Sequence, residues 1–172
     1  MLYSSVYEFA QNISRNKRIM CLDMGKKFIG IACSDTTQTI ASPFLVYQRR
    51  TARKDLGELN NIFISNNVDS LIVGLPTDIC PSFRDNNTDI FLEKLSIEDQ
   101  IWTMEIMSFA GKIAKKSNIS VCFYNESFST IKATKVLRET KMSKKKSHIA
   151  DNKIAACIVL QEVLDQLERA QF

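Results

Sequence analysis

Short apolar runs alternate with segments of helical spacing along the chain, and their order predicts a mixed α/β fold. Apolar residues at helical spacing predict a leading helix over residues 3–14. Three strands are predicted next, at residues 18–24, 28–35 and 43–48. Residues 25–27 leave only a tight turn between the first two strands, so we expect these two strands to be antiparallel.

The rest of the chain alternates helix and strand, which is the pattern of right-handed crossovers in a parallel sheet. The predicted elements are a helix at 52–66, a strand at 70–75, a polar loop at 76–88, a long helical region to residue 116 with a break near 96, a strand at 120–125, a helix at 129–139, a loop at 141–147 and a helix at 148–169. This order predicts a mixed sheet with helices on both faces. Without a repeat or linker, residues 1–172 are expected to form one domain, to which residues 1–17 add the leading helix.

Composition narrows the class of protein without identifying it. The 172 residues are 45% apolar and 24% charged, with a formal net charge of +4, as in an ordinary globular protein. No apolar run is long enough to span a membrane or to act as a signal peptide, so we expect a cytoplasmic protein. The five cysteines are odd in number and never spaced C-x-x-C, which favours buried thiols over disulfides or a zinc site.

The positive charge is concentrated late in the chain. Residues 132–153 are rich in Lys and Arg and contain only two acids, Glu139 and Asp151. Such a segment either contacts the phosphate backbone of a nucleic acid or forms a solvated loop with charged helix faces. The charge pattern alone leaves both interpretations open.

Three carboxylates fall at unusual places in the predicted elements. Asp23 lies inside an otherwise apolar strand, where an ionised group is costly to bury, although it would also suit a cap of the following turn. Glu126 comes directly after the strand at 120–125, and Asp151 opens the last helix on its apolar side. Each of these two acids also has an ordinary role as a favourable charge near a helix N-terminus.

Taken together, the three acids fall at one edge of the predicted sheet, where ligands of open α/β sheets collect. If they converge, their mutual repulsion requires a cation, and Mg²⁺ prefers such oxygen ligands and bridges them to substrate phosphates. The single histidine, His148, excludes a multi-histidine zinc site. The sequence also lacks the phosphate-binding and nucleophile motifs of P-loop NTPases, dinucleotide-binding enzymes and serine hydrolases.

Four segments in this order resemble the YqgF/RuvX family, whose RNase H-like members are described as pre-16S rRNA nucleases or Holliday junction resolvase-like proteins. The segments are "LDMGKKFIGIACSD" (22–35), "VDSLIVGLP" (68–76), "NESFST" (125–130) and "DNKIAACIVLQEVLD" (151–165). The first and last are the more specific. The resemblance covers residues 18 to 167, nearly the whole chain.

The resemblance implies an RNase H-like fold, a mixed five-stranded sheet of order 3-2-1-4-5 with strand 2 antiparallel. It also implies an acidic site of Asp23, Glu126 and Asp151 that binds Mg²⁺ or Mn²⁺ and hydrolyses phosphodiester bonds. The expected role is trimming of the 5′ end of precursor 16S rRNA during ribosome biogenesis. Two alternatives remain open: a Holliday junction resolvase, which needs a dimer, and a catalytically weak nucleic-acid-binding factor.

The sequence departs from the family pattern close to the site. Asn125 and Ser127 flank Glu126 where the family usually has an acid and an arginine, and Phe28 replaces a basic residue. These changes keep the binding-factor alternative open. The protein is expected to be a monomer or a homodimer with a nucleic-acid partner, precursor rRNA or branched DNA.

We assign the contacts to nucleic acid to hydroxyl and lysine side chains near the acids. A hydroxyl and a backbone N–H at the start of the helix at 129–139 would hold a phosphate oxygen. Lysines of the basic segment would follow the strand, and the lysine of the turn at 25–27 either reaches the scissile phosphate or is a plain surface residue. The residues concerned are Lys27, Ser129, Thr130, Lys144, Lys145 and Lys146.

Overall fold

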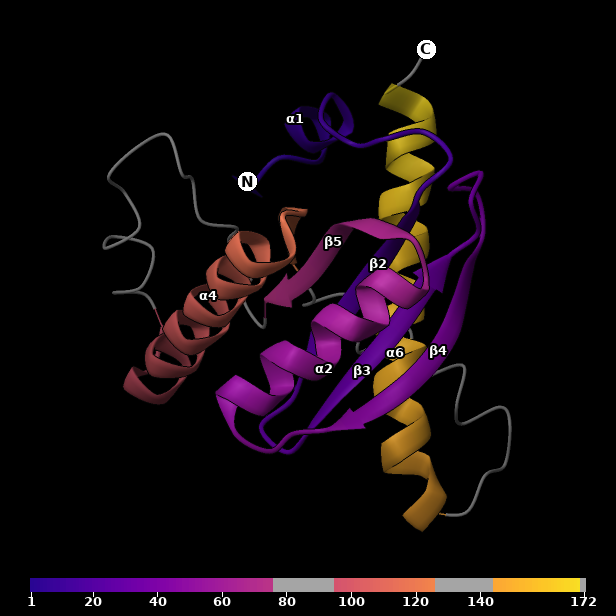
Figure 1. Ribbon diagram of the computed structural model, residues 1–172. Helices are drawn as coiled ribbons and strands as arrows, with labels where there is room; N and C mark the ends of the chain where they lie inside the picture. The colour runs from indigo at the N-terminus through magenta and orange to yellow at the C-terminus, as the bar shows by residue number, and fades with distance from the viewer. Residues whose placement is uncertain (76–94, 126–143, 171–172) are drawn as a thin grey trace.

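A computed structural model describes residues 1–75, 95–125 and 144–170, without the side chains of residues 144–151. Its described strands form one six-stranded sheet of order β1-β6-β5-β2-β3-β4. Strands β5, β2, β3 and β4 are labelled in Figure 1. The strands are β1 (Leu2–Tyr3), β2 (Arg18–Met24), β3 (Phe28–Ser34), β4 (Ala41–Gln48), β5 (Val68–Leu75) and β6 (Ser120–Asn125). Strand β3 is antiparallel to β2 and β4, whereas β2, β5, β6 and β1 run parallel.

The predicted topology is confirmed. The five predicted strands appear as β4-β3-β2-β5-β6, which is the order 3-2-1-4-5 with the second strand antiparallel. The structure adds β1, a two-residue edge strand beside β6 that is too short to show in a hydrophobic pattern. The leading helix is also shorter than predicted, because α1 covers only Val6–Ala10.

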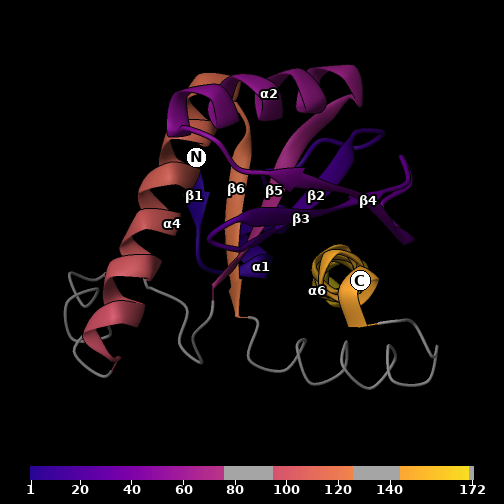
Figure 2. The same cartoon turned by 90° about the horizontal axis from the view of Figure 1, so that it is seen from below.

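Helices cover both faces of the sheet, as predicted (Figure 2). On one face lie α2 (Ala52–Ser65) and α4 (Ile97–Ser117), and on the other lie α1 and the long helix α6 (Lys144–Ala170). Both α2 and α4 begin at a hydroxyl cap, because the side chains of Thr51 and Ser96 accept hydrogen bonds from backbone N–H groups three residues later. None of the described helices is long and apolar enough to cross a membrane.

The alternating side chains of β2 divide the core into two layers. Met20 and Leu22 pack with α2 and α4, whereas Ile19 and Cys21 pack with α6. By the same alternation Asp23 faces the α6 side. Cys21, Cys33 and Cys122 are buried, as expected, whereas Cys157 is only half-buried, and Cys80 lies outside the described residues.

One prediction is wrong at the end of the chain. The loop predicted at 141–147 gives way to α6 at Lys144, so Lys144, Lys145 and Lys146 form the first turn of this helix. Lysine is a favourable helix former and no Gly or Pro separates these residues from the apolar stripe that follows. Asp151 is therefore almost two turns inside the helix rather than at its start.

Candidate active site

Asp23 lies near the carboxyl end of β2, at the centre of the sheet, with its side chain half-buried on the α6 face. Burial raises the pKa of its carboxyl group from 3.8 to about 6, because the low-polarity surroundings disfavour the ionised form. Among the residues that the structure describes, no side chain donates a hydrogen bond to Asp23 or forms an ion pair with it. The buried charge of Asp23 therefore has no counter-charge in this part of the protein.

The strands beside Asp23 present glycines at its level. Gly30 on β3 is its direct partner in the antiparallel pair. On the other side, β5 pairs Val73 with Leu22, and Gly74 follows Val73. Because neither glycine has a side chain, the Asp23 carboxylate is not covered from the adjacent strands.

Helix α6 contacts the sheet closely at this level. A Cβ atom built on Gly30 would lie 2.2 Å from the carbonyl oxygen of Asn152, so the helix backbone packs directly on the glycine. Since Gly30 is the partner of Asp23, the structure brings the backbone of Asp151, the neighbour of Asn152, to the same end of the sheet as Asp23. The Asp151 side chain is outside the described part of the structure.

The carboxyl end of β6 lies at the same edge, two strands from β2. Leu22, Val73 and Phe123 share one row across β2, β5 and β6, and the sheet spacing then separates β2 from β6 by about 10 Å. Tyr124 accepts a hydrogen bond from Nε2 of Gln166 at 2.8 Å, which ties the end of β6 to α6. Glu126 follows Asn125, the last residue of β6, but lies outside the described residues, as do Ser127, Ser129 and Thr130.

The cationic residues predicted to bind nucleic acid lie at the same end of the molecule. Lys27 is exposed in the turn between β2 and β3, and Lys144, Lys145 and Lys146 begin α6, with side chains that are not described. The neighbouring Lys26 is engaged instead with Glu98 of α4, with Nζ 2.8 Å from Oε1.

The sequence analysis missed a buried ion pair that supports the turn after Asp23. The Asp55 carboxylate, 1% exposed, accepts hydrogen bonds from the Tyr47 hydroxyl and the Arg50 N–H, both at 2.9 Å. Arg49 lies 3.8 Å from Asp55 and donates to the carbonyl oxygen of Gly25 at 3.2 Å. The sequence offered one signal for this pair: Asp55 lies in the first turn of a predicted helix, shortly after two arginines. That signal does not reveal the contact of Arg49 with the distant Gly25.

The donor set at this edge suits a hard divalent cation. Asp23 offers a half-buried carboxylate without a counter-charge among the described residues, and such a group gains stability from a cation held by oxygen ligands. The described residues contain no cluster of three acidic, histidine or cysteine ligands, and the two other acids of the predicted set have side chains outside the described part. The described part of the site therefore consists of the Asp23 side chain, the backbone of Asp151 and the end of β6, which precedes Glu126.

Comparisons with known proteins identify the family of this chain. Residues 17–166 match the family model RuvX, described as Holliday junction resolvase. A "Putative pre-16S rRNA nuclease" of Wolbachia pipientis wMel is 42% identical over 167 residues, 97% of each chain. A protein of the same name from Ehrlichia chaffeensis is 40% identical over 96% of each chain.

Two solved structures show a weaker similarity to this chain. Thermus thermophilus RuvC in complex with a Holliday junction substrate has a TM-score of 0.44 and 12% identity, over 88% of this chain and 96% of its own. The yeast mitochondrial resolvase Ydc2 has a TM-score of 0.48 and 12% identity, over 95% of this chain and 86% of its own. The match of the family model to nearly the whole chain, together with relatives about 40% identical, shows that this protein belongs to the RuvX family.

Proposed function

We propose that the protein is a metal-dependent nuclease that hydrolyses phosphodiester bonds at the end of the sheet where Asp23 lies. The observation that carries this proposal is the half-buried carboxylate of Asp23, which has a raised pKa and faces the close contact between Gly30 and Asn152. A protein gains nothing in stability from such a group unless a bound cation offsets its charge. The names of the relatives favour a nucleic-acid substrate.

In the proposed site, Asp23, Glu126 and Asp151 hold Mg²⁺ or Mn²⁺. When bound, the ion stabilises negative charge on the reacting phosphodiester and favours attack by water. Asp23 contributes a fixed ligand, because β2 is hydrogen-bonded on both sides and cannot shift without disturbing β3 and β5. Lys27, Ser129 and Thr130 would hold phosphate oxygens of the substrate on the side of the site that faces solvent.

As substrate we propose the precursor of 16S rRNA, cut at its 5′ end. The experiment uses purified protein with a precursor rRNA fragment or a four-way DNA junction, in Mn²⁺ or in EDTA, with products separated on a gel. We expect cleavage of the RNA in Mn²⁺ and none in EDTA. Cleavage of the junction alone would instead assign a resolvase, and binding of either substrate without cleavage would assign a non-catalytic binding factor.

The first turn of α6 is proposed to follow the backbone of the bound strand. Replacing Lys144, Lys145 and Lys146 by Gln should reduce the slope of log K against log salt for single-stranded RNA by about 2, because each phosphate contact releases about 0.7 of a counterion. Affinity measured by fluorescence anisotropy across a salt series gives this slope.

A matched control for this variant replaces three exposed lysines, Lys112, Lys115 and Lys116, by Gln. They lie toward the C-terminal end of α4, which leads into the start of β6 and so is at the opposite edge of the sheet. The control loses the same charge and should keep the wild-type slope. Equal slopes in all three proteins would show that the lysines of α6 are only solvated.

A further inference from the structure

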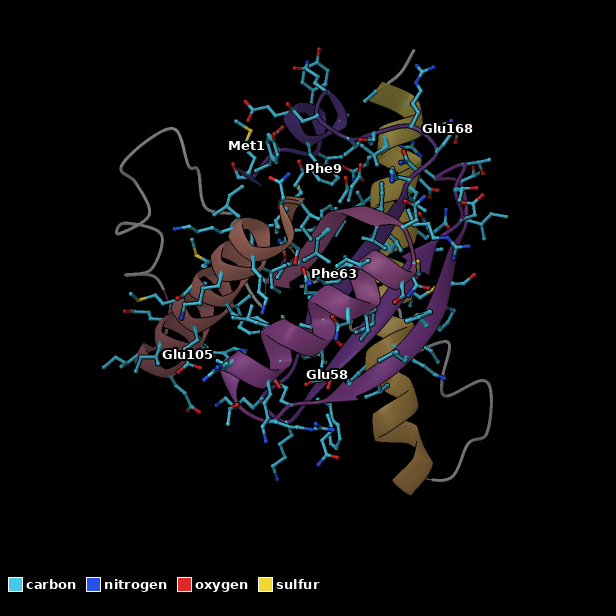
Figure 3. The ribbon with its side chains drawn as sticks, in the orientation of Figure 1. Met1, Phe9, Glu58, Phe63, Glu105 and Glu168 are labelled. Carbon is cyan, nitrogen blue, oxygen red and sulfur yellow. The ribbon has the colours of Figure 1, made fainter. Side chains whose placement is uncertain are left out.

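A cavity of about 610 Å³ lies at the same end of the sheet as Asp23, but on the face covered by α2 and α4. Its walls come from the β2–β3 turn, the connection from β4 to α2 and the first half of α4, and they include Phe28, Gln48, Ile101 and Trp102. Figure 3 shows Glu105, another lining residue, on α4 beside the beginning of α2. The volume is within the ordinary range for small-ligand sites.

The buried ion pair of Arg49 and Asp55 forms part of the cavity wall. The Arg49 guanidinium lies 5.4 Å from the centre of the Trp102 ring and 5.7 Å from that of Phe109, so it stacks on α4 while it pairs with Asp55 of α2. The same side chain donates to the carbonyl oxygen of Gly25. Arg49 thus contacts all three walls of the cavity, and these contacts fix the positions of the walls relative to one another.

The cavity presents positive charge at its opening. Two of its three acids are already neutralised, Asp55 by Arg49 and Glu98 by Lys26. The exposed cations Lys27 and Arg50 also line the cavity, and Glu105 is the one remaining acid of the lining. Two more exposed cations, Arg53 and Lys54, lie just after Arg50 in the sequence, in the first turn of α2. Lysine and arginine side chains placed in this way attract a phosphate backbone.

Apolar and aromatic side chains form another part of the cavity lining. Trp102 and Phe28 are half-buried, and Ile101 is an exposed apolar side chain at 55%. Aromatic side chains bind an unpaired base by stacking, whichever base it is. The combination of an apolar slot with cations at its rim is that of a site for one nucleotide within a single strand.

We propose that this cavity binds an unpaired base of single-stranded nucleic acid, with the adjoining phosphates on Lys27 and Arg50. The proposal rests on the proposed function in one respect: the strand is the one whose scissile phosphate lies at Asp23. The β2–β3 turn separates the two places by only a few residues, since Lys27 follows Asp23 closely and lines the cavity. A nucleic-acid strand that crosses this turn reaches both the cavity and Asp23.

The protein contains a built-in probe, because Trp102 is its only tryptophan. We expect a single-stranded oligoribonucleotide, added in EDTA to prevent cleavage, to quench the Trp102 emission in a saturable way. Inorganic polyphosphate of similar charge should compete for binding without producing the same quench. Unchanged emission while anisotropy reports binding would overturn the proposal, and so would an equal quench by polyphosphate.

Two variants locate the binding site. Ala52→Phe fills the cavity from the exposed start of α2. Arg50→Gln removes a cation but keeps the backbone N–H that donates a hydrogen bond to Asp55. Each should weaken oligonucleotide binding about 5- to 10-fold, and Ala52→Phe should also remove the quench. Lys115→Gln, at the far end of α4, is the control and should bind as the wild type does. Wild-type affinity in both cavity variants would contradict the proposal.

Failure of this proposal can be separated from failure of the proposed function. A quench that persists in a protein unable to cleave any substrate in Mn²⁺ would support the cavity and reject the nuclease. Cleavage that persists in Ala52→Phe with unchanged oligonucleotide affinity would reject the cavity alone.

Discussion

Replacing Asp23 by Asn should abolish metal-dependent cleavage and, in the same protein, raise the stability of the metal-free fold. The stability effect follows from the burial that raises the pKa of Asp23 to about 6, and the loss of cleavage follows from the loss of a carboxylate ligand. Asn keeps the shape of the side chain but has no charge to bury and is a poor ligand for a hard cation. If Asp23 served only to stabilise the fold, its replacement would not both abolish cleavage and increase stability.

The stability effect has a defined dependence on pH. The folded protein binds the Asp23 proton more tightly than the unfolded chain, whose carboxyl has a pKa near 3.8. The contribution of Asp23 to the stability of the metal-free wild type should therefore fall as pH rises from about 4 to about 6, and stay unfavourable above pH 6. A shift of about two pKa units corresponds to about 3 kcal/mol, and the variant should lack this loss.

Urea unfolding in EDTA between pH 4 and pH 8 measures this difference. We expect the curves of wild type and Asp23→Asn to coincide near pH 4 and to separate up to pH 6, with the variant more stable. Added Mn²⁺ should raise the midpoint of the wild type only. As a control, Asp165→Asn makes the same chemical change at an exposed position on α6 and should behave as wild type in every assay. An Asp23 variant that still cleaves at the wild-type rate would reject the metal site.

The strand order was expected from the family resemblance, whereas the type of each strand was predictable from local signals. The tight turn at 25–27 fixes β2 and β3 as antiparallel, and the apolar runs of β5 and β6 mark strands covered on both faces. The same reasoning identified Asp23 as a carboxylate in a half-buried position, which the structure shows. The roles of Asp23, Glu126 and Asp151 remain predictions.

Other features depend on contacts that no local pattern shows. The N-terminal strand β1 exists because Leu2 and Tyr3 pair with Val121 and Cys122, more than a hundred residues later. The link from Arg49 to Gly25 and Trp102 likewise joins segments that are distant in the sequence. The start of α6 was misplaced because a run of lysines is equally compatible with a solvated loop and with a solvated first turn.

The role of Gly30 was only partly predictable from the sequence. A glycine inside an apolar strand signals a bulge or a close backbone approach, and this signal was present in the segment that forms β3. The sequence could not say which element approaches. The structure identifies it as α6, whose Asn152 packs on Gly30, the strand partner of Asp23.

Gly30→Ala is therefore expected to have the second large effect. Its Cβ would lie 2.2 Å from the carbonyl oxygen and 2.4 Å from the carbonyl carbon of Asn152, and a helix backbone cannot yield as a side chain does. Helix α6 must move away from β3, at a cost of about 3 kcal/mol in the free energy of unfolding. The same displacement moves Asp151 relative to Asp23, and a misplacement of about 1 Å at a reacting centre costs about 100-fold in rate.

Gly57→Ala is the matched control for this substitution, because nothing lies within 4 Å of a Cβ at Gly57. In the interior of α2 the change should increase stability by up to about 1 kcal/mol and leave cleavage unchanged. Urea unfolding and cleavage rates in Mn²⁺ then compare two identical substitutions with opposite expected signs. If Gly30→Ala were as stable and as active as Gly57→Ala, α6 could not be packed on β3 beside Asp23, and the proposed placement of Asp151 in the site would be wrong.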